Sequence, residues 1–244
     1  MQHWQRVRNY FIDQGFPEAL LDFVCIHSDE ASQIIDIIEK KNSHSILEIG
    51  TFIGLSTGII ALASAPSCTL VSVDPNLPVD ILSKRFNYPE SHGSLVFARN
   101  MLEHFGICQK VILLEGYFSC PSSSYRERYL TLGGDPEAID RKKIDIVGEH
   151  VEEFAPYDIV FIDGDHSTES VYSDLSLVYH YISENSIIIL HDLDPRGYWE
   201  RYVRAGVMKF LEDHPGFSLS INGNLGFLCR ESHSSSHDEN LERT

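Results

Sequence analysis

Short apolar runs alternate along this chain with segments whose apolar positions repeat at helical spacing. Near the N-terminus, residues 4–14, residues 17–27 and a segment opening at Asp29-Glu30 each carry an apolar stripe typical of a short helix. From residue 45 onward, continuous apolar runs appear that end at Gly or Asp, a pattern typical of buried strands. These runs predict strands at residues 45–50, 69–74, 110–116, 157–164 and 186–192.

Helix-like segments separate the predicted strands, at residues 54–65, about 90–105, 168–183 and 198–214. Two more runs, 217–221 and 225–230, flank Asn222-Gly223-Asn224, which is a hairpin signal. Strands that alternate with helices predict parallel pairing through right-handed crossovers. Because the strands are apolar throughout, both faces of the sheet should be covered. The fold class is therefore α/β, a doubly wound and mostly parallel sheet with an antiparallel last strand.

The length of 244 residues suits one large domain with additions. We predict an N-terminal helical cap at 1–43 and the α/β domain at 44–230. Within that domain, residues 117–156 show no clear element. A segment of that length beside the ligand-binding edge predicts a lid over the substrate, with simple decoration as the alternative. The polar, serine-rich residues 231–244 predict a disordered tail.

The charge balance narrows the range of partners. Lys and Arg number 19 against 36 Asp and Glu, a formal net charge of −17. A field of that sign repels phosphate backbones, which argues against nucleic acid and anionic membranes and leaves small molecules and cations. The five cysteines form no CxxC pair, the start lacks a signal-peptide core, and no apolar run reaches the length of a membrane span. We therefore expect a cytoplasmic protein, and association into a homo-oligomer stays open.

The loop after the first predicted strand is the first candidate for ligand binding. It reads Glu48-Ile49-Gly50-Thr51-Phe52-Ile53-Gly54, a GxxxG spacing in which glycines allow a tight turn and close approach of a ligand. A dinucleotide fingerprint would need GxGxxG, so a pyrophosphate cradle is disfavoured. The acidic Glu48 just before the loop suits a ligand with a cationic amino group. The alternative is an ordinary turn from strand to helix.

The second predicted strand ends at Asp74. A carboxylate at this position can accept hydrogen bonds from both hydroxyls of a ribose, as acidic residues do in nucleotide-binding α/β folds. Asp before Pro75 is also a common start of a turn, which is the competing interpretation. The combination with the glycine loop favours a nucleoside-containing cofactor.

Four segments together resemble a known family: ILEIGTFIGLSTGIIALA, VSVD, FIDGDHSTESVYSDL and IIILHDL. They are similar to the class I S-adenosylmethionine-dependent methyltransferases. The nearest group is that of the small-molecule O-methyltransferases, which includes the macrocin, mycinamicin and cephalosporin-type enzymes and has catechol-type relatives. The resemblance covers about residues 44–230 and implies a seven-stranded, Rossmann-like sheet. It also implies a cofactor site made of Glu48, Gly50, Thr51, Gly54, Ser56, Asp74, Gly116, Tyr117, Ser119 and Asp163.

Within this implied site, the resemblance distributes the parts of S-adenosylmethionine. Glu48 and the two loop glycines would line its methionine portion, and Asp74 would take the ribose hydroxyls. Gly116, with Tyr117 and Ser119, would flank the adenine.

Two predicted strands end in carboxylates, Asp163 after the fourth and Asp192 after the fifth. Neighbouring parallel strands lie about 4.8 Å apart, so the two side chains can converge. Carboxylates that close repel unless one is protonated or a cation lies between them. A divalent metal (Mg or Mn) held by Asp163, His191 and Asp192 would resolve this and could grip substrate oxygens.

The residues around this pair differ from the magnesium enzymes that the chain resembles. Those carry an acidic residue where His191 stands, and the catechol-type enzymes have Asn where Leu193 stands. Imidazole is a better ligand for manganese, iron or zinc than for magnesium. The alternative is that Asp163 and Asp192 only cap loops.

His166, three residues after Asp163, is the candidate general base. In the similar sugar methyltransferases a histidine at this offset has that role, and an imidazole can take the proton of a hydroxyl as the methyl group transfers. We therefore assign His166 and Asp163 as catalytic residues of an O-methyltransferase for a sugar or catechol-like acceptor. The competing interpretation of His166 is an exposed residue at a helix start. For the whole chain the competitors are a nicotinamide-dependent oxidoreductase and an inactive S-adenosylmethionine-binding protein.

Overall fold

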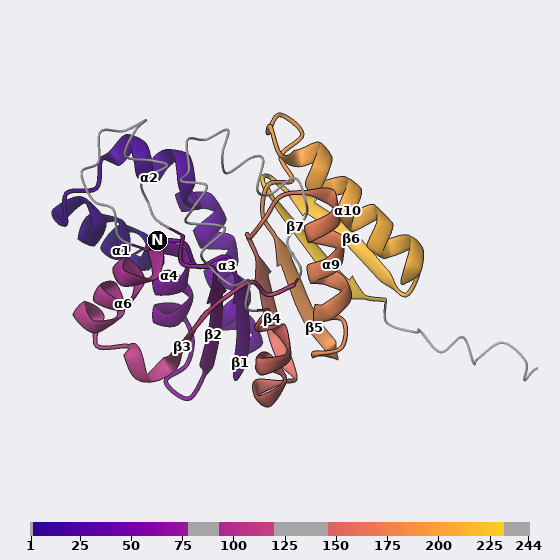
Figure 1. The fold of residues 1–244 in the computed structure, drawn as a ribbon, viewed down its shortest axis with the longest axis horizontal. Helices are drawn as coiled ribbons and strands as arrows, with labels where there is room; N and C mark the ends of the chain where they lie inside the picture. The colour runs from indigo at the N-terminus through magenta and orange to yellow at the C-terminus, as the bar shows by residue number, and fades with distance from the viewer. Residues whose placement is uncertain (1, 78–92, 120–145, 232–244) are drawn as a thin grey trace, which may run out of the picture.

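A seven-stranded sheet forms the centre of the computed structural model, which describes residues 2–77, 93–119 and 146–231 (Figure 1). The strands lie in the order β3-β2-β1-β4-β5-β7-β6. Strands β1 to β5 pair in parallel, and β7 runs antiparallel to both β5 and β6. This confirms the predicted fold class. The strand bounds are β1 Ser45–Ile49, β2 Thr69–Asp74, β3 Val111–Glu115, β4 Tyr157–Ile162, β5 Ile182–Leu190, β6 Phe217–Asn222 and β7 Leu225–Arg230.

Helices cover both faces of the sheet (Figure 1). One face carries α1 Gln2–Asp13, α2 Glu18–Val24, α3 Ser28–Lys41, α4 Leu55–Ala63 and α6 Ser94–Phe105. The other carries α9 Thr168–Val178, α10 Glu200–Asp213 and the 3-10 helix η2 Gly148–Phe154, while a 3-10 turn, η1 Cys108–Lys110, leads into β3.

Successive residues of the central strands are buried against opposite helical layers. In β1, Ile46 packs into the core on the α4 side and Leu47 into the core on the α9 side. The same alternation holds for Phe161 and Val160 of β4. Side chains point to opposite faces in turn, so a strand covered on both faces must be apolar at every position.

The N-terminal helices share the core of the α4 face. Val7 and Phe11 of α1 and Ile34 of α3 are fully buried in the same cluster as Ile59 of α4. Full burial of each such side chain contributes about 1.5–3 kcal/mol, so residues 2–41 are firmly attached to the domain. That they also cover the substrate stays a prediction.

Two predicted boundaries were wrong. The sequence predicted that a helix ends at residue 183 and that the next strand begins at residue 186. Helix α9 ends at Val178 and β5 begins already at Ile182. The Tyr157 amide donates to the Tyr181 carbonyl, and the Ser186 hydroxyl donates to the Tyr157 carbonyl. These bonds pull the polar start of β5 against β4, where the register shifts.

The predicted lid and tail fall largely outside the described residues. Of the segment 117–156, only residues 117–119 and 146–156 are described, and the predicted tail is described only at Glu231. Among the helices that are described, none combines the length and the apolarity needed to cross a bilayer.

Candidate active site

The loop between β1 and α4 takes backbone conformations that favour glycine. Gly50, Phe52 and Gly54 have φ angles of 99°, 48° and 95°. A side chain at Gly50 would also collide, because its Cβ would lie 2.1 Å from the carbonyl oxygen of Asp163. The loop is therefore packed directly against the end of β4, where the carboxylate of Asp163 emerges.

Asp74 lies at the end of β2, beside this loop. One carboxylate oxygen accepts from the Phe52 amide at 2.8 Å, and the other accepts from the Asn76 amide at 2.7 Å and the Ser94 hydroxyl at 2.8 Å. These bonds fix the direction of the carboxylate and tie it to the glycine loop. The Asp74 carboxylate thus lies at the carboxyl edge of the sheet beside the glycine loop, where the sequence predicts the ribose hydroxyls.

Glu48 lies beneath the loop and is fully buried. It accepts hydrogen bonds from the hydroxyls of Thr57 at 2.6 Å and Ser72 at 2.5 Å, and Thr51 lies 2.5 Å from the Ser72 hydroxyl. Burial raises the pKa of Glu48 to about 7, against the opposing effect of Ser56, Ser72 and Thr57. Glu48, Thr51 and Ser56 thus form a buried polar cluster that supports the loop from below.

The residues predicted to flank adenine follow β3. The Gly116 amide donates to the Asp74 carbonyl at 2.9 Å, which holds the end of β3 beside that of β2. Tyr117 pairs with Ile146 in an isolated parallel β-bridge. Ser119 is buried and donates to Asp174 of α9 at 2.5 Å. The Ser119 oxygen can still accept a hydrogen bond from a ligand. Its contact with adenine stays a prediction.

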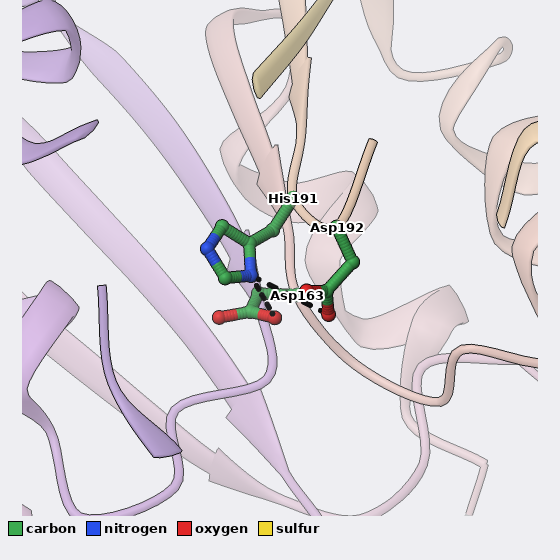
Figure 2. A group of neighbouring side chains, drawn as sticks. All are labelled: Asp163, His191 and Asp192. Carbon is green, nitrogen blue, oxygen red and sulfur yellow. Dashed lines mark ion pairs between the residues drawn. The ribbon is translucent and has the colours of Figure 1, made fainter. Parts of the chain in front are cut away.

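The carboxyl ends of β4 and β5 bring together the three residues predicted to hold a metal (Figure 2). Asp163 follows β4, and His191 and Asp192 follow β5. His191 Nδ1 lies 3.2 Å from Asp163 Oδ1 and 3.5 Å from Asp192 Oδ2. One potential ligand atom from each residue lies within 4.8 Å of the others. The convergence of the two carboxylates that the sequence predicts is therefore present.

His166 reaches the same point from the turn before α9. Its Nε2 lies 2.6 Å from Asp192 Oδ2 and 3.4 Å from Asp163 Oδ1. Its ring stacks on Trp199, with centroids 5.3 Å apart and an 18° angle between the planes. His166 is thus a partly buried member of the cluster, unlike the exposed helix-start residue that was the competing interpretation.

The turn that carries His166 is fixed by the first turn of α9. Ser167 accepts from the Ser170 amide at 3.2 Å and is the N-cap. Asp165 accepts from the hydroxyls of Ser167 and Ser170 at 2.8 and 2.6 Å. Both neighbours of His166 are thus held to the helix start, which fixes the backbone from which its ring reaches the carboxylates.

Charge in this cluster is closely balanced. Burial lowers the pKa of His166, but Asp163 and Asp192 outweigh it and raise the pKa to about 9. Burial acts in the opposite sense on Asp163 and Asp192, yet the two histidines hold both carboxyl pKa values below their usual range. Without a cation, the positive charge of protonated imidazole offsets the repulsion between the two carboxylates.

Two imidazole nitrogens in the cluster lack a well-directed hydrogen bond. His166 Nε2 and His191 Nδ1 are both buried without one, although carboxylate oxygens lie within 3.5 Å of each. Buried polar atoms are nearly always satisfied, and the one on His191 belongs to the group of three potential metal ligands, so its Nδ1 suits a cation shared with Asp163 and Asp192.

The sequence prediction missed Glu30, Asn224 and Trp199. Glu30 lies in the first turn of α3, and Asn224 lies just before β7. Asn224 donates to Glu30 Oε1 at 2.9 Å, and Glu30 Oε2 lies 3.3 Å from His191 Nε2. Only Glu30 carried a local signal, the capping box that it forms with His27.

The comparison with known families is decisive for the class of protein. Residues 47–193 match the model of a family described as a methyltransferase domain. The chain belongs to this methyltransferase family. The match spans both the glycine loop and the His191-Asp192 pair, and it displaces the nicotinamide-dependent alternative. A search of curated proteins found no match.

Solved structures share the fold at low identity. An O-methyltransferase from Bacillus cereus in complex with SAH is 14% identical, with a TM-score of 0.58 over 94% of this chain and 91% of that one. The O-methyltransferase TomG from Streptomyces achromogenes, in complex with SAM, is 15% identical, with a TM-score of 0.54 over 94% and 90%. A putative O-methyltransferase from Klebsiella pneumoniae is 21% identical, with a TM-score of 0.52 over 95% and 99%.

Proposed function

We propose that this methyltransferase moves the methyl group of S-adenosylmethionine to a hydroxyl of a small acceptor, a sugar or a catechol-like molecule. The observation that carries the proposal is the convergence of Asp163, His166, His191 and Asp192 at one edge of the sheet. The glycine loop touches this cluster through Gly50, and the hydroxyl and methyl donor would meet there. The O-methyltransferase from B. cereus in complex with SAH and TomG in complex with SAM, which share the fold, support the choice of donor and of reaction.

The residues around the glycine loop fit S-adenosylmethionine. The donor, when bound, supplies an activated methyl group on a sulfonium. Asp74, at the end of β2 beside the loop, would hold the ribose through its carboxylate, and the loop would allow close approach of the methionine portion. Displacement at the methyl carbon needs the acceptor oxygen in line, so the protein contributes mainly by positioning.

The cluster at β4 and β5 fits a divalent cation. Asp163, His191 and Asp192 would hold it, and the evidence for the fit is the unsatisfied Nδ1 of His191 together with the close approach of the three potential ligand atoms, which lie within 4.8 Å of one another. The ion would supply a positive charge that lowers the pKa of the acceptor hydroxyl. The mixed nitrogen and oxygen donors favour Mn²⁺ over Mg²⁺.

His166 would accept the proton of the acceptor hydroxyl. With a pKa of about 9, its imidazole is mostly protonated at neutral pH and cannot act as a base while the negative charges of both carboxylates stabilise the protonated form. A cation between Asp163 and Asp192 would remove that hold and make the imidazole available. The metal and the base are therefore linked in this proposal.

The test begins with binding and ends with turnover. Calorimetry should show S-adenosylhomocysteine bound at micromolar strength, and labelled S-adenosylmethionine with a panel of sugars and catechols should identify a methylated acceptor. EDTA should lower the rate, and Mn²⁺ should restore it at least as well as Mg²⁺. Binding of the cofactor without turnover on any acceptor would favour an inactive binding protein, and full activity in EDTA would remove the metal from the proposal.

A further inference from the structure

Asp174 and Ser119 form a buried pair that joins the segment after β3 to the helix after β4. The Ser119 hydroxyl donates to Asp174 Oδ1 at 2.5 Å. The other carboxylate oxygen, Oδ2, lies 3.9 Å from the position that a Cβ on Gly164 would take. Because Gly164 belongs to the turn that follows β4, the pair reaches from one strand end to the other.

The order of the strands places this pair beside the predicted cofactor site. Strands β2 and β1 lie between β3 and β4 in the sheet, and they end at Asp74 and at the glycine loop. The Gly116 amide, three residues before Ser119, donates to the Asp74 carbonyl at 2.9 Å. With the sulfonium of the donor directed to the cluster at β4 and β5, the base on the other side of the ribose would be directed toward residues 116–119.

The hydrogen bond to Asp174 fixes what Ser119 can offer such a base. A hydroxyl has one proton to donate, and its oxygen can accept. An ionised carboxylate only accepts, so the Ser119 proton must point at Asp174 and only the oxygen is left for a ligand. The 6-amino group of adenine can donate to that oxygen, whereas the 6-oxo group of hypoxanthine is itself an acceptor and would be repelled.

We propose that Asp174 is a positioning residue for nucleobase specificity, which takes the proton of Ser119 so that the Ser119 oxygen accepts from the 6-amino group of adenine and disfavours a 6-oxo base. This inference rests on the proposed function, in which the donor is S-adenosylmethionine with its ribose at Asp74. It gives a role to a buried carboxylate that methyl transfer itself does not use.

The charge of Asp174 decides the pH of the test. Burial raises the pKa of Asp174 to about 7; Asp165 adds to this effect, and the Ser119 hydroxyl opposes it. A protonated Asp174 could donate to Ser119 and free the hydroxyl proton for a 6-oxo group. At about pH 8.5 Asp174 is mostly ionised, and taking up that proton would weaken binding of a 6-oxo base by about 30-fold, since each pH unit above the pKa costs tenfold.

Asparagine removes this cost without removing the hydrogen-bond partner. Its amide can turn either the oxygen or the NH₂ group toward Ser119. With adenine bound, the oxygen would accept the Ser119 proton, as the carboxylate does. With a 6-oxo base bound, the NH₂ group would donate to Ser119, whose own proton would then go to the base. Asp174→Asn should therefore keep its affinity for adenine and tolerate the 6-oxo base.

The experiment measures two ligands by calorimetry at about pH 8.5. They are S-adenosylhomocysteine and S-inosylhomocysteine, which differ in the 6-amino and 6-oxo groups. Wild type should prefer S-adenosylhomocysteine, and this preference should fall by about 10- to 30-fold in Asp174→Asn, with affinity for S-adenosylhomocysteine within threefold of wild type. Asp13→Asn, at the exposed end of α1, is the matched control and should keep the wild-type preference.

Two results would overturn the inference while leaving the methyl-donor proposal standing. One is an Asp174→Asn variant whose preference stays within threefold of that of wild type. The other is a wild type that binds S-inosylhomocysteine as tightly as S-adenosylhomocysteine or more tightly. Binding of neither ligand to wild type would overturn the proposed donor and this inference with it. If Asp174→Asn does not fold, Ser119→Ala takes its place and should also lower the preference, because it removes the oxygen that distinguishes the two bases.

Discussion

Replacing Asp174 by Asn should stabilise the protein, and the gain should depend on pH. Asp174 of α9 is 5% exposed, and it accepts a hydrogen bond from the Ser119 hydroxyl at 2.5 Å. Burial, with a smaller contribution from Asp165, raises its pKa from 3.8 to about 7, although the Ser119 hydroxyl acts in the opposite sense. Between these two pH values the unfolded chain has released the proton while the folded chain still holds it.

The sign and size of the effect follow from that difference. A carboxyl whose pKa is raised by folding lowers stability as pH rises from 3.8 to about 7, and the loss is constant above that. Each pH unit in the window is worth about 1.4 kcal/mol, so the loss between about pH 5.5 and pH 7 is about 2 kcal/mol. Asn keeps the acceptor for Ser119 without the charge, so the variant avoids this loss.

Urea unfolding at about pH 5.5 and at about pH 8 measures the effect. The advantage of Asp174→Asn over wild type should grow by about 2 kcal/mol between the two conditions. Asp13→Asn, at the exposed end of α1, is the control and should show no such growth. An advantage of Asp174→Asn that is equal at both pH values would mean that the carboxyl titrates normally in the folded protein, and the reasoning from its burial would be refuted.

Three further predictions concern the site. Asp74→Ala should weaken S-adenosylhomocysteine binding by about 1–3 kcal/mol in calorimetry. Ser94→Ala, which removes one hydrogen-bond donor to Asp74, should weaken this binding less. His166→Ala and His166→Gln should lower turnover by about 10²–10⁴ with cofactor affinity nearly intact; an alanine variant within threefold of wild type would exclude the base role. Gly50→Ala should abolish cofactor binding and lower the melting temperature, because its Cβ would meet the Asp163 carbonyl at 2.1 Å; unchanged calorimetry would contradict the packing argument.

The sequence by itself determined the sheet and the edge at which the site lies. Strands that are apolar throughout are typical of a mostly parallel sheet covered on both faces, and such a sheet puts the carboxyl ends of its parallel strands at one edge. The carboxylates of Asp163 and Asp192 therefore had to be near each other once their strands were neighbours. The glycine spacing likewise predicted the tight loop, and Gly50 and Gly54 do have positive φ angles.

Tertiary structure alone decided which groups complete the cluster. Glu30 and Asn224 are 194 residues apart in the chain, and each looks locally like an ordinary cap or turn residue. Their contact with His191 arises because α3 packs on one face of the sheet while β7 inserts beside β5. No local pattern encodes that meeting.

Tertiary structure also set the charge states that the chemistry needs. The pKa of His166 depends on two carboxylates, one of them 26 residues further along the chain, and on the burial of all three groups. The sequence supplied the residue types and their places at strand ends, because hydrophobic periodicity is local. Distances between side chains from different elements, and hence proton affinities, exist only after the layers have packed, because Coulomb and desolvation energies depend on position in space.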